Sequence, residues 1–173
     1  MLIDFIVGTR PNFMKIFPVI SRLEKSGLEG IEYRLIHTGQ HFDFEMSGIF
    51  FSQLKMDSEV IFLNVNRNSN AVNLANIVLG LSKLLDTQQP DAFLLYGDTI
   101  STLAGTLVAR DYQIPIYHVE AGLRSGDWTM TEELSRVVTD FSSHVLFCPT
   151  ANACKNLMKD SVTGDIVFSG DVM

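Results

Sequence analysis

The sequence predicts a doubly wound α/β domain built on a mostly parallel sheet. Short apolar runs alternate with longer stretches of period 3.6 from one end of the chain to the other. Several of the short runs are apolar almost throughout, as expected for parallel strands that are covered on both faces. The chain has 173 residues, 46% of them hydrophobic, which is enough to bury the core of one domain. Because consecutive parallel strands are joined through helices, right-handed crossovers between the strands are expected.

Seven apolar runs are candidate strands, and three stretches between them have clear helical periodicity. The strands are expected at residues 2–7, 33–37, 60–63, 92–96, 114–119, 145–148 and 166–169. The first helix contains Pro18, where we expect a kink. A second helix follows Ser69 and ends before Pro90, and a third follows Thr131. Their apolar stripes comprise Phe13, Ile16, Phe17, Ile20 and Leu23; Ala71, Leu74, Val78, Leu81 and Leu85; and Leu134, Val137, Val138 and Phe141.

The composition restricts the classes of partner. Thirteen basic against twenty acidic residues give a formal charge of −7, which argues against broad binding to nucleic acid or to an anionic membrane. Cys148 and Cys154 are too few for a disulfide framework and are expected to be reduced thiols. The amino terminus lacks the pattern of a secretory signal, and no apolar stretch approaches the roughly 20 residues of a membrane span. We therefore expect a soluble, cytoplasmic protein.

The loops after the predicted strands carry most of the unusual polar residues. Ligands of open α/β sheets bind beyond the carboxyl ends of the strands, so these loops are the first place to seek a site. The loop after the first strand contains neither a dinucleotide-binding nor a P-loop glycine pattern. It does place Arg10 and Lys15 near a helix N-terminus, where an anion is favoured. The alternative is a tight turn with two solvated cations.

The histidines do not predict a metal site. His37 and His41 are separated by a glycine-containing loop, which lacks the helical spacing that puts two imidazoles on one face. His118 and Glu120 form an H-x-E pattern like that of zinc deaminases, but the two cysteines are six residues apart instead of three. We therefore expect no metal.

Three carboxylates have both a catalytic and a structural interpretation. Asp98 and Glu120 come directly after buried strands, where an uncompensated acid is costly. Asp98 could instead cap the helix that follows it, and Glu120 could pair with Arg124. Glu132 could pair with Arg136, four residues along the same helix. Three acids, several cations and three histidines at one edge together favour an active site.

Five blocks of the sequence occur in a recognisable order. They are Gly8-Thr9-Arg10-Pro11 with Lys15, Thr38-Gly39-Gln40-His41, Gly97-Asp98-Thr99, His118-Val119-Glu120-Ala121-Gly122-Leu123-Arg124 and Glu132-Glu133-Leu134-Ser135-Arg136. With these blocks the chain resembles the non-hydrolysing UDP-N-acetylglucosamine 2-epimerases over its whole length. The resemblance implies a Rossmann-like fold that forms one half of a glycosyltransferase-B type two-domain enzyme. Residues 1–173 would be the N-terminal domain, and the nucleotide-binding C-terminal domain would be absent.

The resemblance also implies an activity and a set of residues. The family interconverts UDP-N-acetylglucosamine and UDP-N-acetylmannosamine by anti elimination of UDP and its re-addition, without a metal or redox cofactor. The implied partner is a UDP-sugar, and the full-length protein is expected to be a homodimer. The implied catalytic residues are Arg10, Lys15, Asp98, Glu120 and Glu132. The implied substrate-binding residues are Gly8, Thr9, Gln40, His41, His118, Arg124 and Arg136.

Other functions remain open at this point. A hydrolysing relative would release free N-acetylmannosamine, and another two-domain transferase could share parts of the pattern. A protein of a different class, a non-catalytic module that binds or assembles around a sugar nucleotide, would also fit a chain without its second domain.

Overall fold

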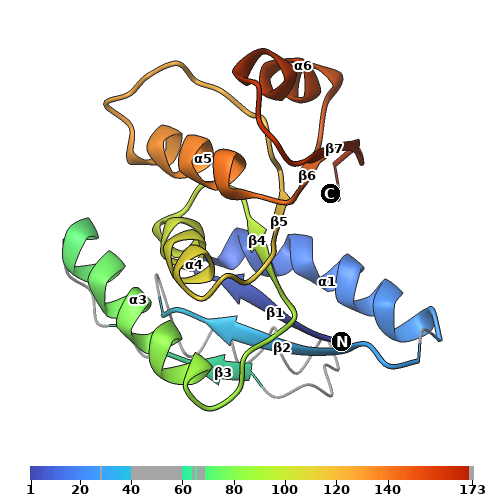
Figure 1. Cartoon of the computed structure of the whole chain (residues 1–173), viewed down its shortest axis with the longest axis vertical. Helices are drawn as coiled ribbons and strands as arrows, with labels where there is room; N and C mark the ends of the chain where they lie inside the picture. Colours follow the sequence, from blue (N-terminus) through green and yellow to red (C-terminus); the bar gives the residue numbers. More distant parts are fainter. Residues whose placement is uncertain (28, 40–59, 64, 66–68, 172–173) are drawn as a thin grey trace.

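The fold is described from a computed structural model, which describes residues 1–27, 29–39, 60–63, 65 and 69–171 (Figure 1). Within these residues a seven-stranded sheet runs through the molecule in the order β3-β2-β1-β4-β5-β6-β7, and every neighbouring pair is parallel. The predicted α/β class with a parallel sheet is therefore confirmed. The strands are β1 (Leu2–Val7), β2 (Glu32–His37), β3 (Val60–Phe62), β4 (Ala92–Tyr96), β5 (Ile116–Val119), β6 (Val145–Cys148) and β7 (Asp165–Phe168).

The strand boundaries differ from the sequence prediction most clearly at β5. The prediction began this strand at Ile114, whereas the ladder begins at Ile116. The backbone N–H of Ile114 donates to the carbonyl of Ala109 at 2.8 Å, so Ile114 belongs to the turn that ends the preceding helix. An apolar run alone does not distinguish a strand residue from a buried turn residue next to it.

Helices cover both faces of the sheet (Figure 1). The helices are α1 (Arg10–Lys25), α3 (Asn70–Leu85), α4 (Ile100–Asp111), α5 (Thr131–Ser142) and α6 (Ala151–Asp160). Phe5 and Leu94 point to the face where Ile16 and Ile20 of α1 pack, whereas Ile6 and Leu95 point to the face covered by α3 and α4. Cys148 and Leu146 of β6 pack with α6 in a third apolar cluster.

Two features of the helices bear on the predictions. Helix α1 continues through Pro18 to Lys25, so the proline does not end it. Helix α3 ends at Leu85, before Pro90, as its periodicity predicts. Among the described residues, no helix combines the length and the apolar character needed to cross a membrane.

Candidate active site

The carboxyl ends of β1, β4 and β5 bring together residues that are far apart in the sequence. Lys15, in the second turn of α1, donates from Nζ to Oε1 of Glu120 at 2.5 Å. The two side chains are 16% and 17% exposed, so the pair is sheltered but accessible to a ligand. The structure therefore corrects the alternative in which Glu120 pairs with Arg124.

Glu120 has an unusual backbone conformation. Its φ is +68°, in the left-handed region that residues with a side chain rarely occupy. The neighbouring turn is formed by Gly97, which has a φ of +63°. A Cβ atom on that glycine would lie 3.2 Å from Oε2 of Glu120. The two turns therefore fit closely together, and the positive φ aims a carboxylate beyond the end of β5; such backbone strain is typical of functional sites.

Asp98 lies one residue after this glycine and pairs with a cation from another element. Arg136 of α5 donates from Nη2 to Oδ2 of Asp98. The alternative in which Asp98 caps α4 is wrong, because Thr99 is the capping residue: its Oγ1 accepts from the N–H of Thr102. Asp98 is 30% exposed and is thus more accessible than Glu120. The site therefore contains two carboxylate–cation pairs.

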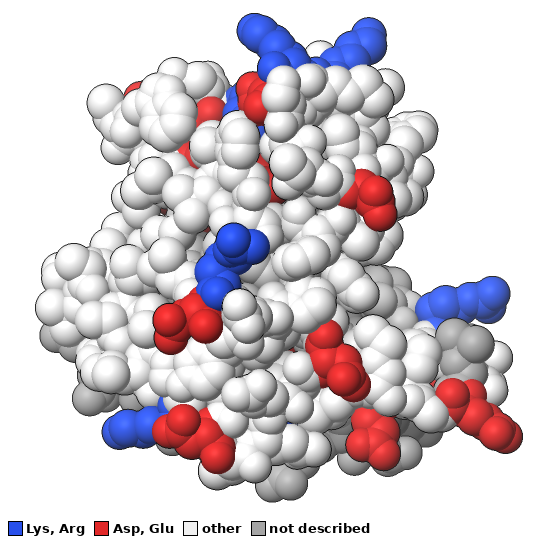
Figure 2. Space-filling model, in the orientation of Figure 1, with Lys and Arg blue, Asp and Glu red and all other residues white. Residues whose placement is uncertain are grey.

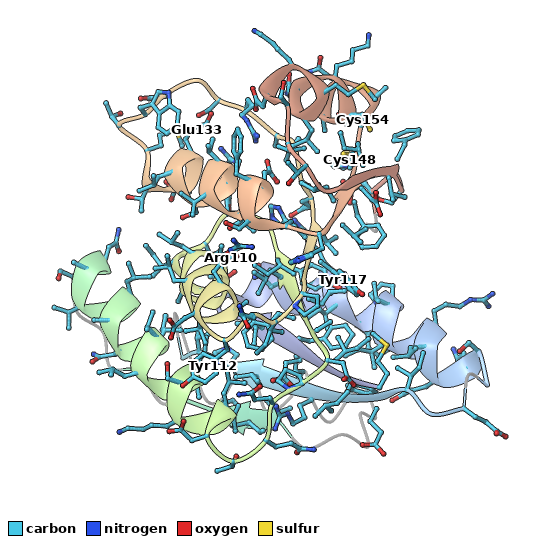
Figure 3. The ribbon with its side chains drawn as sticks, in the orientation of Figure 1. Arg110, Tyr112, Tyr117, Glu133, Cys148 and Cys154 are labelled. Carbon is cyan, nitrogen blue, oxygen red and sulfur yellow. The ribbon has the colours of Figure 1, made fainter. Side chains whose placement is uncertain are left out.

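Glu133, which is not among the predicted site residues, organises the loop before α5. It lies on α5 beneath the loop at 125–126 (Figure 3). Its carboxylate accepts hydrogen bonds from the N–H groups of Ser125 at 2.9 Å and Gly126 at 3.0 Å, and from Nη1 of Arg136 at 2.9 Å. Burial raises the pKa of Glu133, but these donors outweigh burial and bring the pKa to about 2. The adjacent acidic pair in the sequence was the signal that could have drawn attention to this residue.

The neighbouring Glu132 has a different environment. It is exposed, and the described residues contain no ion pair between Glu132 and Arg136, so the predicted pairing is wrong, although Glu132 does lie in the first turn of α5, where an acid is favourable. Its side chain lines a hollow of about 250 Å³. Three sequence-predicted residues meet at this hollow: Thr9 just before α1, Asp98 after β4 and Glu132 in the first turn of α5. Its lining comprises Thr9, Asn70, Asp98, Thr99, Ile100, Thr131 and Glu132.

Some of the predicted residues cannot be placed in this arrangement. Gln40, His41 and the side chain of Arg10 lie outside the described residues.

The two predicted residues that precede α1 are described. Gly8 is buried, and Thr9 donates from its hydroxyl to Oδ1 of Asn12 at 2.9 Å.

His118 and Arg124, which the resemblance assigns to substrate binding, take part in internal contacts. His118 is 0% exposed, so its ring does not reach the surface. Arg124 donates to Asp140 at 2.6 Å and pairs with Asp160 at 2.9 Å. Asp140 is itself fully buried and was not selected from the sequence. A ligand therefore has no access to the ring of His118 in this conformation.

Two buried polar atoms near the site lack a partner. Within the described residues, neither the hydroxyl of Tyr96 nor Nδ2 of Asn12 makes a hydrogen bond. Burial raises the pKa of Tyr96, and the nearby charge of Glu120 raises it further. An unsatisfied buried polar group is costly, so these two groups are candidates to bind water or part of a ligand.

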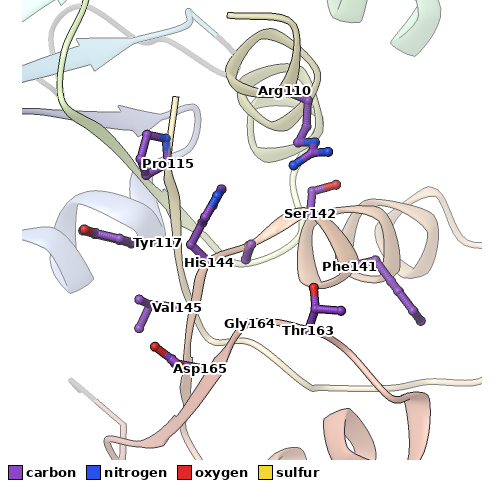
Figure 4. Close-up of a pocket in the computed structure, with 11 residues that line it drawn as sticks. Arg110, Pro115, Tyr117, Phe141, Ser142, His144, Val145, Thr163, Gly164 and Asp165 are labelled. Atoms are coloured by element: carbon purple, nitrogen blue, oxygen red, sulfur yellow. The ribbon is translucent and has the colours of Figure 1, made fainter. Parts of the chain in front are cut away.

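A larger hollow lies at the opposite edge of the sheet (Figure 4). Its volume is about 530 Å³, and it is formed at the amino ends of β5, β6 and β7. Arg110, His144 and Asp165 line it, and none of the predicted site residues does.

On the face shown in Figure 2, acidic and basic side chains are scattered among the described residues without a continuous basic patch. The two carboxylate–cation pairs, Lys15 with Glu120 and Arg136 with Asp98, lie at the carboxyl edge of the sheet and not at the larger hollow.

Comparison with known proteins assigns the chain to a family. Residues 23–173 match the family model described as UDP-N-acetylglucosamine 2-epimerase. The chain is 42% identical over 173 residues to a UDP-N-acetylglucosamine 2-epimerase homolog of Methanococcus maripaludis, covering 100% of this chain and 47% of the relative. It is 40% identical over 178 residues to the UDP-2,3-diacetamido-2,3-dideoxy-D-glucuronate 2-epimerase of Pseudomonas aeruginosa, covering 100% and 49%. The chain thus spans about half the length of the curated relatives it matches.

Solved structures agree with this assignment. The crystal structure of Methanocaldococcus jannaschii UDP-GlcNAc 2-epimerase in complex with UDP-GlcNAc and UDP matches with a TM-score of 0.91 and 38% identity, covering 99% of this chain and 47% of that one. A lipopolysaccharide outer core galactosyltransferase shares the fold alone, with a TM-score of 0.71 and 15% identity. The sheet is thus that of one half of a glycosyltransferase-B type enzyme. By its sequence match and its architecture, the chain is a member of the UDP-N-acetylglucosamine 2-epimerase family.

Proposed function

We propose that this chain, completed by the second half that its relatives contain, interconverts UDP-N-acetylglucosamine and UDP-N-acetylmannosamine. The observation that carries the proposal is the meeting of two carboxylate–cation pairs, Lys15 with Glu120 and Arg136 with Asp98, at one edge of the sheet. Family membership supports the reaction class, and the two pairs supply groups for moving a proton and for stabilising an anion.

The proposed chemistry is an elimination followed by an addition. The proton on carbon 2 of an acetamido sugar is weakly acidic, so its removal alone is slow. If a base removes that proton while the bond between carbon 1 and the phosphate oxygen breaks, the products are 2-acetamidoglucal and UDP. UDP then re-adds at carbon 1 while an acid returns a proton to the opposite face of carbon 2. Two faces require two proton-handling groups.

The residues divide into two proposed roles. Glu120, Asp98 and Glu132 are the candidates for proton transfer, because their carboxylates approach the site from different elements: the turns after β5 and β4 and the first turn of α5. Lys15 is the candidate for stabilising the departing diphosphate. A diphosphate that binds the Lys15 ammonium would compete with Glu120 for it and so release that carboxylate to act as a base.

The identity of the sugar is a separate question. The relative from Pseudomonas aeruginosa is a 2-epimerase of a UDP-diacetamido-glucuronate, and its identity to this chain is close to that of the Methanococcus maripaludis relative. Both relatives therefore support epimerisation at carbon 2 of a UDP-linked acetamido sugar. We propose UDP-N-acetylglucosamine as the substrate, on the strength of the family model.

The test uses a completed protein, meaning this chain joined to the second half found in its relatives. It is incubated in heavy water with either UDP-sugar, and NMR follows the proton on carbon 2. Exchange of that proton with formation of UDP-N-acetylmannosamine, at a rate on the order of 1 per second, is expected. Release of free N-acetylmannosamine would indicate the hydrolysing reaction instead. Binding without exchange would indicate a non-catalytic module.

The 173-residue chain tested alone is the matched control. Because relatives with this fold are about twice as long, we expect the chain alone to bind UDP weakly and to exchange no proton at carbon 2. Exchange at an enzymatic rate by this chain would contradict the need for the second half.

A further inference from the structure

A buried hydrogen-bonded chain connects helix α5 to the two loops that carry the candidate carboxylates. The ring of His118 lies between Oδ1 of Asp140, 2.7 Å from Nδ1, and the carbonyl oxygen of Gly97, 2.8 Å from Nε2. His118 and Asp140 are both 0% exposed. Neither belongs to the pairs that define the site, so their role requires a separate explanation.

The partners of the ring determine its protonation. The carbonyl of Gly97 can only accept, so Nε2 of His118 carries a proton and donates it. The other carboxylate oxygen of Asp140 accepts from the N–H of Gly122 at 3.1 Å and from Nη1 of Arg124 at 2.6 Å. Both contacts to this oxygen therefore come from donors, one of them a guanidinium, and Nδ1 of His118 lies 2.7 Å from the other oxygen. Donation from both ring nitrogens, to Asp140 and to Gly97, would make the ring of His118 an imidazolium.

This chain fixes both strand-end turns. Gly97 is held twice by β5, because its N–H donates to the carbonyl of Val119 at 3.0 Å while its carbonyl accepts from His118. Asp98 is the next residue after this glycine. On the other side, Asp140 holds the N–H of Gly122, two residues after Glu120. One buried carboxylate thus anchors the turn before Asp98 and the turn after Glu120.

We propose that His118 and Asp140 are positioning residues that set the separation between the carboxylates of Asp98 and Glu120. The proposal rests on the proposed function, because a fixed separation matters only if these two groups act on one substrate. An elimination needs its base and acid in defined places, and a shift of about 1 Å in such a group can lower the rate about 100-fold. The buried ring of His118, in contact with Asp140 and Gly97, is the element that joins the two turns.

The first test measures protonation in the 173-residue chain itself. With histidine labelled in its ring nitrogens, NMR at neutral pH should show protons on both nitrogens of His118. His144 provides an internal comparison, because its Nδ1 accepts from the N–H of Ile116 at 3.1 Å and so carries no proton. A His118 ring with one bare nitrogen would overturn the imidazolium assignment.

The second test separates the two contacts of the ring in the completed protein. In His118→Asn the amide occupies the position of Nδ1, so it can reach Asp140 but not Gly97. In His118→Gln the amide occupies the position of Nε2, so it keeps the contact to Gly97 and loses the one to Asp140. Each variant should lower kcat by about 10- to 100-fold with a smaller change in KM, and His118→Gln should retain the higher kcat. His144→Gln, at the opposite edge of the sheet, should leave kcat unchanged.

Folding is measured alongside these rates. If His118 only fills space, both variants lower the melting temperature or the yield, while kcat per folded molecule equals that of the wild type; that result overturns the proposal. Asp140→Asn provides a further check, since it removes the charge without changing the shape, and it should also lower kcat more than it changes KM. If the wild-type completed protein shows no exchange at carbon 2, the proposed function fails. The NMR spectrum then decides the imidazolium assignment alone.

Discussion

Asp4 and Glu120 are both paired with a cation at a strand of the same sheet, yet their surroundings differ in every other respect. Asp4 is inside β1, is 0% exposed, and receives two hydrogen bonds of 2.7 Å from the guanidinium of Arg34, the residue opposite it on β2. Glu120 is just beyond β5, has a positive φ, and receives one hydrogen bond from Lys15. The first pair joins two strands, whereas the second is held in a strained turn that a ligand can reach.

This difference separates a structural carboxylate from a candidate catalytic one. Burial raises the pKa of Asp4, although Arg34 acts in the opposite direction. The carboxylate is thus costly to bury and depends on its partner. Glu120 is partly exposed, and its pairing with a flexible lysine can be exchanged for pairing with a substrate phosphate. Substitution of Asp4 should therefore change the stability of the fold, whereas substitution of Glu120 should change turnover.

Asp4→Asn should produce the largest change in stability. Asparagine keeps one acceptor oxygen but loses the charge that pairs with Arg34, which still contacts Gln88, and we expect the free energy of unfolding to fall by about 1.5–3 kcal/mol. Urea titration of the 173-residue chain measures this loss. The control is Asp91→Asn, because Asp91 is 63% exposed and should contribute less than about 1 kcal/mol. Equal losses for the two variants would remove the distinction between a buried pair and a surface one.

Glu120→Gln should instead affect turnover. The amide preserves the shape of the side chain but cannot accept the proton from carbon 2, so kcat of the completed protein should fall by about 100-fold or more. The stability of the folded chain should change by only about 0–1 kcal/mol, because the pair is partly exposed. Glu32→Gln, at an exposed position of β2, controls for the loss of a charge. A Glu120→Gln protein with wild-type turnover would leave Asp98 and Glu132 as the proton-handling groups.

Lys15→Ala should weaken nucleotide binding by a smaller amount. Loss of one charge-assisted contact to a diphosphate typically costs about 1–3 kcal/mol, which calorimetry with UDP and the completed protein would measure. Arg22→Ala, an exposed cation in the last turns of the same helix, should leave UDP affinity unchanged. Equal effects of the two variants would indicate that the lysine contributes only to the general charge of the surface.

These comparisons also define how far the sequence alone could lead. The strands β4 and β6 were predicted with the boundaries that the structure has, because a fully apolar run between turns is a local signal. The position of the polar motifs at the carboxyl edge followed from the prediction of a parallel sheet, because parallel strands all end at the same edge. Local pattern and topology were therefore sufficient to predict the fold and to bring the candidate residues to one edge of the sheet.

The partners of the charged residues could not be predicted in this way. The sequence suggested that Glu120 pairs with Arg124, four residues away, whereas its partner is Lys15, 105 residues away. Similarly, Arg136 was expected to pair with Glu132 and instead contacts Asp98 and Glu133. Ion pairs depend on where packing brings side chains, and many arrangements of similar charges are close in energy. Sequence proximity is therefore a weak guide to them.

Glu133 provides the smallest and most specific test, because its effect depends on pH. Its pKa is about 2 in the folded chain against an ordinary value of 4.5, so its hydrogen bonds stabilise the fold fully above pH 4.5. As the pH falls from 4.5 towards 2, the unfolded chain takes up the proton first and this stabilisation is lost. Near neutral pH, Glu133→Gln should lower the free energy of unfolding by about 1–2 kcal/mol.

The decisive measurement is the pH dependence of the difference between Glu133→Gln and the wild type. Urea titrations at steps from neutral pH down to about 3 should show the difference narrowing as the wild-type carboxylate loses its advantage over the amide. Glu132→Gln is the matched control, because the carboxylate of Glu132 is exposed and does not accept the hydrogen bonds from Ser125 and Gly126 that Glu133 accepts. A difference for Glu133→Gln that stays constant with pH would mean that side-chain shape, and not the ionised carboxylate, holds the 125–126 loop against α5.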